Sequence, residues 1–130
     1  MTSTPLSAVY APDYYAPTHT PSMRKLPLVA AAVSAAGLAR LIAPSVSHRM
    51  HVVEHLERLH DPQYVAAFLS GEKPLASSNG FAWSETLRDG VLAINAGHLN
   101  GAELALREGI AANIGQGFHH ASYDRGEGFC

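Results

Sequence analysis

Two adjacent histidines near the C-terminus, His119 and His120, are the residues of this sequence best suited to chemistry. One imidazole of such a pair can take up and return a proton near neutral pH, while the other stabilises developing charge. The pair lies in the glycine-rich segment 115–130, directly after a short apolar run, and ligands bind at such positions in open α/β sheets. Glycines let the backbone approach a ligand closely, and Phe129 can wall a substrate channel. The alternative is a pair of loop histidines with a purely structural role.

A second histidine pattern, from His51 to His55, fits the His-x-x-Glu-His pattern of inverted zinc peptidases. On a helix, the two histidines share one face and could hold zinc, with Glu54 as the general base. A third ligand is needed, and none of the downstream glutamates lies in a recognisable motif. A solvated helix face is therefore the favoured interpretation of this segment.

The elements that must position these residues follow from apolar periodicity and turn residues. Strands are expected over residues 6–10, 41–44 and 110–114, the last buried on both faces because it carries no charge. Helices are expected over residues 23–36, from an N-cap at Ser47 to residue 59, over 61–69, and from an N-cap at Ser84 to residue 107. The segment 72–80 is predicted to be a surface loop. Helices that alternate with short buried strands predict an α/β fold.

The longest of these helices has a predicted inner face with three- and four-residue spacing, made of Leu87, Val91, Ile94, His98, Ala102 and Ala105. His98 is expected to be a satisfied core or interface histidine on this face. Trp83, just before the helix, is expected to anchor the preceding loop to it.

Length and composition predict a single domain with a substantial core, since the chain has 130 residues, 47% of them apolar and 15% charged. A net charge of −2 and a pI near 6.4 argue against direct binding of nucleic acid. The single cysteine, Cys130, excludes an internal disulfide and fits a soluble protein of the reducing cytoplasm. The most apolar stretch, residues 26–43, is too short and too interrupted to span a membrane. No signal for an oligomeric state is present.

The C-terminal segment also carries a resemblance to a known family. A glycine, His119-His120-Ala121 and then Asp-Arg-Gly-x-Gly-Phe-Cys resemble the signature of the zinc-dependent histone deacetylase family. Phe118, before the histidine pair, resembles the class IV branch and related bacterial members. Further similarities follow in chain order, at residues 9–14, 19–25, 54–65 and 108–115.

This resemblance implies a three-layer arginase–deacetylase-type fold, with a parallel sheet flanked by helices. It also implies hydrolysis of N-acetyl-lysine, or of a related acylated amine, by a zinc-bound water. His120 would be the main general base and acid, and His119 its electrostatic partner. Gly128 would offer its carbonyl to the substrate amide, and Phe129 would line the acyl-lysine tunnel. The implied partner is an acetylated protein or a small acylated amine.

The sequence departs from the family pattern at three places. Ala96-Gly97-His98 stands where the family has a Gly-Gly-Thr helix start. Gln116 lies between two glycines where the family has Gly-Gly, and Phe81 falls where some members place an aspartate that holds the peptide backbone. The family's zinc ligands and oxyanion-stabilising tyrosine follow the Gly-Phe-Cys element, so no metal ligand is expected among residues 1–130. We therefore expect residues 1–130 to be the N-terminal part of a single deacetylase-like domain, truncated before the zinc-ligand motif and inactive alone. The alternative is a non-catalytic remnant of the fold used for binding or assembly.

Overall fold

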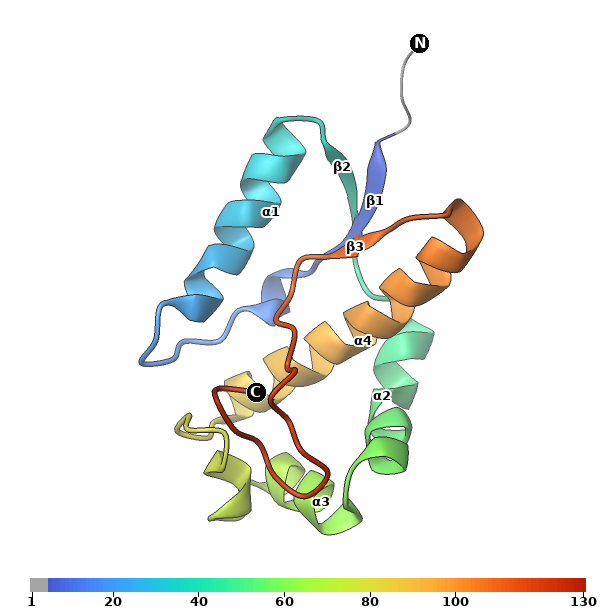
Figure 1. Ribbon diagram of the computed structural model, residues 1–130. Coiled ribbons are helices and arrows are strands. Elements are labelled where there is room, and N and C mark those ends of the chain that lie inside the picture. Colours follow the sequence, from blue (N-terminus) through green and yellow to red (C-terminus); the bar gives the residue numbers. More distant parts are fainter. Residues whose placement is uncertain (1–4) are drawn as a thin grey trace.

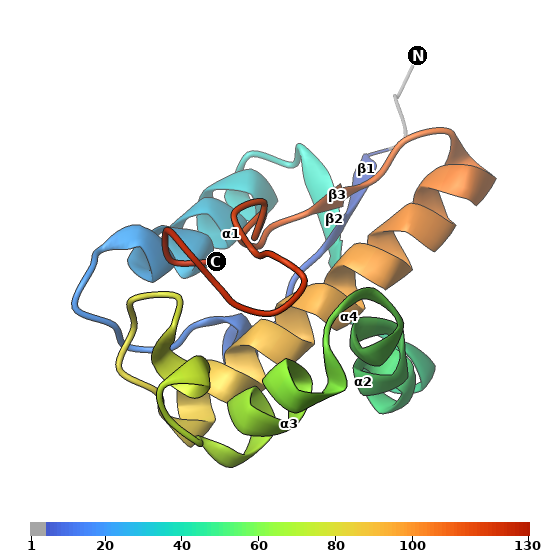
Figure 2. The same cartoon turned by 60° about the horizontal axis from the view of Figure 1, so that its bottom comes forward.

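The computed structural model describes residues 5–130, which form a small parallel sheet between two layers of helices (Figure 1). The strands are β1 (Leu6–Val9), β2 (Ala39–Ile42) and β3 (Ala112–Asn113), in the order β2-β1-β3. The helices are α1 (Lys25–Ala35), α2 (Val46–Leu59), α3 (Pro62–Ser70) and α4 (Glu85–Glu108), with short 3₁₀ helices at Pro12–Tyr14, Ser22–Arg24 and Leu75–Ser77. Helix α1 lies on one side of the sheet and α2 and α4 lie on the other, as both views show (Figure 2). The predicted α/β fold with a parallel, helix-flanked sheet is confirmed.

Most helix ends follow the capping residues that the sequence provides. The Ser84 hydroxyl accepts a hydrogen bond from the Leu87 backbone N–H at 3.0 Å, and Gly109 follows the last turn of α4. Helix α2 corrects the prediction, because Ser45 rather than Ser47 is its N-cap and accepts from the His48 N–H. Ser45 has extended backbone angles, so the helix begins one residue later, at Val46.

The third strand is shorter and more exposed than predicted. Only Ala112 and Asn113 pair with β1, and Ile110 is 67% exposed, so the expected burial of residues 110–114 on both faces is wrong. The physical reason is that β3 is an edge strand of the described sheet and pairs with β1 only at Ala8 and Val9. The residues on either side of this short pairing are therefore left partly exposed. The second strand is also displaced, since it starts at Ala39 opposite Leu6 rather than at Leu41.

Helix α4 turns a different face to the sheet than its large apolar residues predict. Leu87 and Ile94 are buried as expected, but the C-terminal half buries Gly97, Asn100, Gly101 and Leu104. His98 and Ala102 are exposed instead, which corrects their assignment to the inner face. The cause is close approach: a Cβ at Gly97 would collide with the Tyr14 hydroxyl and lie 2.7 Å from Asn113 Oδ1. Small residues therefore define the contact between this helix and the strands.

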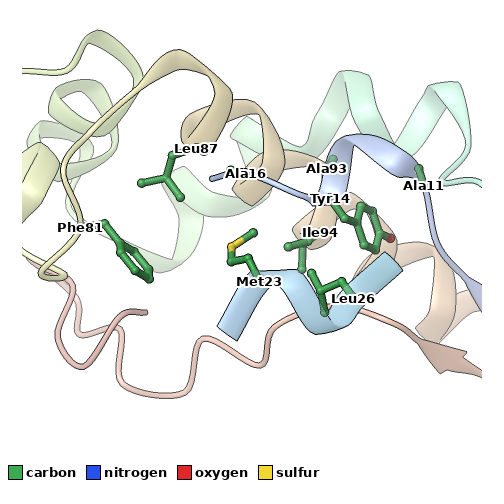
Figure 3. Close-up of a cluster of buried hydrophobic side chains, with 9 residues drawn as sticks. All are labelled: Ala11, Tyr14, Ala16, Met23, Leu26, Phe81, Leu87, Ala93 and Ile94. Carbon is green, nitrogen blue, oxygen red and sulfur yellow. The ribbon is translucent and has the colours of Figure 1, made fainter. Parts of the chain in front are cut away.

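The core gathers where α1, α4 and the segment after β1 meet (Figure 3). It consists of Ala11, Tyr14, Ala16, Met23, Leu26, Phe81, Leu87, Ala93 and Ile94. The Tyr14 hydroxyl donates to Asn113 Oδ1 at 2.7 Å, and Asn113 Nδ2 donates to the Ile94 carbonyl at 3.1 Å. Burial raises the pKa of the Tyr14 phenol far above its usual value, so it remains a donor. This network joins β3 to α4 just before the histidine segment begins.

Within residues 5–130, no helix is both long enough and apolar enough to cross a membrane.

Candidate active site

The two histidines lie at the centre of a tight turn in the loop that follows β3. The Ala121 backbone N–H donates to the Phe118 carbonyl at 3.1 Å, which closes the turn around the pair. The two imidazole rings have centroids 4.0 Å apart and are inclined by 56°. Both residues are exposed. Proton transfer to or from a bound ligand is therefore sterically open at both rings.

Phe118 anchors this turn to the hydrophobic core. Its backbone is left-handed, with φ of +50°, which costs a non-glycine residue about 1 kcal/mol. Its ring packs against the hydrophobic core and meets the His98 ring edge-on, with centroids 6.4 Å apart. The half-buried ring thus holds a backbone conformation that leaves the next two side chains exposed.

Gly128 brings a second stretch of the same loop against the pair. Its carbonyl oxygen lies 3.5 Å from His120 Nδ1, at the long limit of a hydrogen bond. The residue has φ of +55°, and a Cβ there would lie 2.6 Å from His120 Nδ1. Glycine is therefore required by conformation and by space together. A proton held on Nδ1 facing this carbonyl leaves Nε2 free to accept one.

An aromatic group frames the site beside Gly128. The Phe129 and Phe81 rings have centroids 4.8 Å apart, and His19 meets each of them edge-on at 5.6 Å. Asn79 holds both phenylalanines, because its side-chain Oδ1 accepts from the Phe81 N–H at 3.0 Å and its carbonyl accepts from the Phe129 N–H at 2.8 Å. Sequence reasoning noted Phe81 only as the place of a missing aspartate, so its role as the partner of Phe129 was not predicted.

The segment 72–80 corrects the expectation of a surface loop. Ala76 and Asn79 are buried, and the Ser78 hydroxyl accepts from the Gly126 N–H at 2.9 Å. A Cβ at Gly126 would lie 2.8 Å from Asn79 Cβ, so the two segments are in tight contact. Burial also raises the pKa of the nearby Tyr64 phenol. This segment is therefore the support on which the end of the histidine loop rests.

Trp83, which follows the segment 72–80, makes other contacts than expected. Its indole N–H donates to the Phe68 carbonyl at 2.6 Å, and its ring leaves no room for a side chain at Gly71. The guanidinium of Arg88, on α4, lies over the same ring at 5.9 Å. Trp83 thus joins the end of α3 to the start of α4.

All four predicted site residues line one cavity of about 490 Å³. Its apolar wall comes from core side chains that the sequence motif did not indicate, among them Met23, Phe81, Leu87 and Val91. In Figure 3, Met23, Phe81 and Leu87 gather at one end of the core cluster, which is the end that borders the cavity. The roles of His119, His120, Gly128 and Phe129 in a reaction remain predictions.

Residues 5–130 do not by themselves fit a metal centre. In the described part of the chain, no group of three or more His, Cys, Asp or Glu side chains is placed to hold an ion. Helix α2 separates His51 from His55 by one turn, and His51 Nδ1 lies 2.8 Å from the Ser47 carbonyl of its own helix. The zinc-peptidase alternative therefore finds no support.

Comparison with known proteins identifies the family. The histone deacetylase domain matches residues 19–130, and the chain belongs to that family. An uncharacterized protein of Picosynechococcus sp. (strain PCC 7002) is 33% identical over 129 residues, which cover 94% of this chain and 42% of that relative. The chain thus spans less than half the length of this relative. No solved structure matched the chain.

Proposed function

We propose that this chain carries the histidine half of a deacetylase site that hydrolyses N-acetyl-lysine or a related acylated amine. The observation that carries the proposal is the pair of outward-facing imidazoles, 4.0 Å apart, on a 490 Å³ cavity that Phe129 and Gly128 also line. Family membership supports the reaction class. We also propose a cytoplasmic location, on the ground of the single cysteine.

In this proposal each residue of the loop has a separate task. His120 accepts the proton of the attacking water at Nε2 and returns it to the leaving amine. Nε2 is the accepting nitrogen because Nδ1 faces the Gly128 carbonyl. His119 stabilises the charge that develops beside it. Phe129, paired with Phe81, excludes water along one side of the acyl chain, and the Gly128 carbonyl orients the substrate amide.

The family implies zinc, which would polarise the acyl carbonyl when bound. Because the described residues do not fit a zinc centre, no step is assigned to the metal here. We propose that residues 1–130 form the N-terminal part of one deacetylase-like domain, whose metal ligands lie in its remaining part. The 130-residue chain alone is then expected to be inactive.

Two assays of acetyl-lysine peptide hydrolysis test this function. The 130-residue chain is expected to give no turnover with or without added zinc. The product of the complete reading frame that contains these residues is expected to be active, and His120→Ala should lower its kcat/KM by about 10²–10⁴-fold. His51→Ala, on the exposed face of α2, is the matched control and should leave kcat/KM unchanged. Turnover that survives His120→Ala contradicts the proposal.

A non-catalytic binding role is the second candidate. It is favoured by large apolar side chains that are exposed at the ends and edge of the sheet, where Leu38 is 66% and Ile110 67% exposed. If this role holds, the complete protein binds a partner through Ile110 and keeps that binding when His120 is replaced by Ala. If the catalytic proposal holds, Ile110→Lys should leave kcat/KM within about twofold once folding is verified.

A further inference from the structure

The cavity at the histidine pair has a one-sided set of charges. Its described polar lining consists of Thr20, Ser22, Lys25, Asn79, Gln116, His119, His120 and Cys130. Lys25 is the one residue among them whose side chain carries a full charge at neutral pH, and no acidic side chain of the described residues lines the cavity. A ligand that carries an ammonium group would therefore meet cationic or neutral groups at this wall.

The two carboxylates nearest in sequence to the cavity-lining segment 128–130 are already paired with an arginine. Glu127, beside Gly128, accepts a hydrogen bond from Arg125 Nε at 2.7 Å. Asp124 Oδ1 lies 3.5 Å from Arg125 Nη1. The first turn of α1, where Lys25 lies, contains no acidic residue. These charges therefore leave the cationic side of the cavity uncompensated.

Gln116 adds an unused hydrogen-bond donor to the same wall. Its Nε2 is buried and has no hydrogen-bond partner in the described structure. A buried donor without an acceptor is costly, but Nε2 has no accessible surface, so a ligand in the cavity could accept from it only if the Gln116 side chain moved. The hydroxyls of Thr20 and Ser22, 2.8 Å apart, belong to the same lining.

We propose that this cavity binds amides whose acyl group carries its own carboxylate, and that Lys25 recognises that carboxylate. This inference rests on the proposed function, because it names the substrate class of the same site. Charge complementarity favours an acidic acyl chain over an acetylated polyamine, whose remaining ammonium groups have no counter-charge here. Lys25 is then a residue that determines specificity, while the histidine pair performs the proton transfers.

A binding series with three amides of similar shape isolates the charge. Succinamate is negative, butyramide is neutral and 3-aminopropanamide is positive. Each can be titrated into the 130-residue chain, with the Cys130 carboxylate blocked as an amide because Cys130 lines the cavity, while the imidazole resonances of His119 and His120 are followed by NMR. Succinamate is expected to bind about fivefold more tightly than butyramide, as for a partly exposed ion pair, and 3-aminopropanamide most weakly. Lys25→Met should remove the preference, and Lys25→Arg should keep it.

Lys73 provides the matched control, because it is exposed and does not line this cavity. Lys73→Met should leave the preference for succinamate intact. Equal binding of succinamate and butyramide, tighter binding of the cationic amide, or an unchanged preference in Lys25→Met would each overturn the inference. The proposed function is tested separately by hydrolysis in His120→Ala, so charge-independent binding together with His120-dependent deacetylation overturns only the inference about the acyl group.

Discussion

Glycine has opposite uses in helix α4 and in the histidine loop. In α4, Gly97 has ordinary helical angles and is required because Tyr14 and Asn113 leave no space for a Cβ. In the loop, Gly128 adopts a left-handed conformation and faces the exposed ring of His120. The helix thus uses Gly97 only for close packing, whereas Gly128 in the loop also reaches a left-handed backbone conformation. Substitution of a glycine in α4 should therefore mainly lower the stability of the protein. Substitution of Gly128 in the loop should mainly change the geometry of the site.

The largest expected effect follows from Gly97→Ala. The added methyl would collide with the Tyr14 hydroxyl and break its hydrogen bond to Asn113, so the free energy of unfolding should fall by about 3 kcal/mol. Urea denaturation measures this loss. Gly101→Ala is the control in the same helix, because its nearest neighbours lie at ordinary distances of 3.7–3.9 Å. It should stabilise the protein by about 0.5–1 kcal/mol through helix propensity, and equal losses in both variants would contradict the packing argument.

Removal of one hydroxyl tests the network that joins the two regions. Tyr14→Phe leaves Asn113 Oδ1 without its buried donor and should lower the free energy of unfolding by about 1–2 kcal/mol. Tyr10→Phe, at a half-buried ring edge-on to Tyr14, lies outside this network and should change it by less than about 0.5 kcal/mol. Thermal unfolding of both variants under one condition provides the measurement. A smaller loss for Tyr14→Phe than for Tyr10→Phe would remove the network from the account of stability.

Substitution in the loop should alter geometry more than stability. Gly128→Ala forces a Cβ to 2.6 Å from His120 Nδ1 at a left-handed position, so it should cost about 1 kcal/mol and displace the His120 ring. Gly117→Ala, where the nearest atom lies 3.7 Å away on His119, should leave both rings in place. Imidazole proton shifts report the displacement, and unshifted His120 signals in Gly128→Ala would show that this contact does not position the ring.

The smallest effect concerns pH. Desolvation lowers the pKa of His98, although the residue as a whole is exposed. The unfolded chain keeps a histidine pKa near 6.5 and therefore binds more protons than the folded chain just below that pH. This contribution to stability is present above about pH 6.5 and is lost as the pH falls. His98→Gln should make stability less sensitive to pH between 7 and 5, relative to the exposed His51→Gln. An identical slope would exclude His98 as a source.

Local signals were sufficient for most of the fold. The cap at Ser84 and the end of α3 at Gly71 act through contacts within a few residues, so the sequence pattern predicts them directly. Asp61 was expected as the first residue of α3 and is its N-cap. The strands could be predicted from short apolar runs that alternate with helices, although their bounds were displaced. Non-local packing was not predictable: nothing in the spacing of α4 indicates that Gly97 and Gly101, rather than His98 and Ala102, face the strands.

The candidate site divides in the same way. His119, His120, Gly128 and Phe129 lie in one motif, so the sequence alone names them. Phe81, Met23 and Leu87 come from three separate segments and become neighbours only through folding. Asn79 was missed because its surroundings, rich in Pro, Ser, Asn and Gly, suggest a loop. Its side chain bonds locally to the Phe81 N–H, but its carbonyl accepts from the Phe129 N–H, which only the tertiary fold brings near.

Those two bonds also have a consequence for the rate at which a ligand exchanges. Because Asn79 holds the backbone of Phe81 through its side chain and that of Phe129 through its carbonyl, the two rings are tethered to one residue. Fluctuations of the rings should therefore be synchronised, with a single relaxation time in NMR dispersion measurements rather than two. Entry and escape of a ligand past these rings should then both depend on that single relaxation rate.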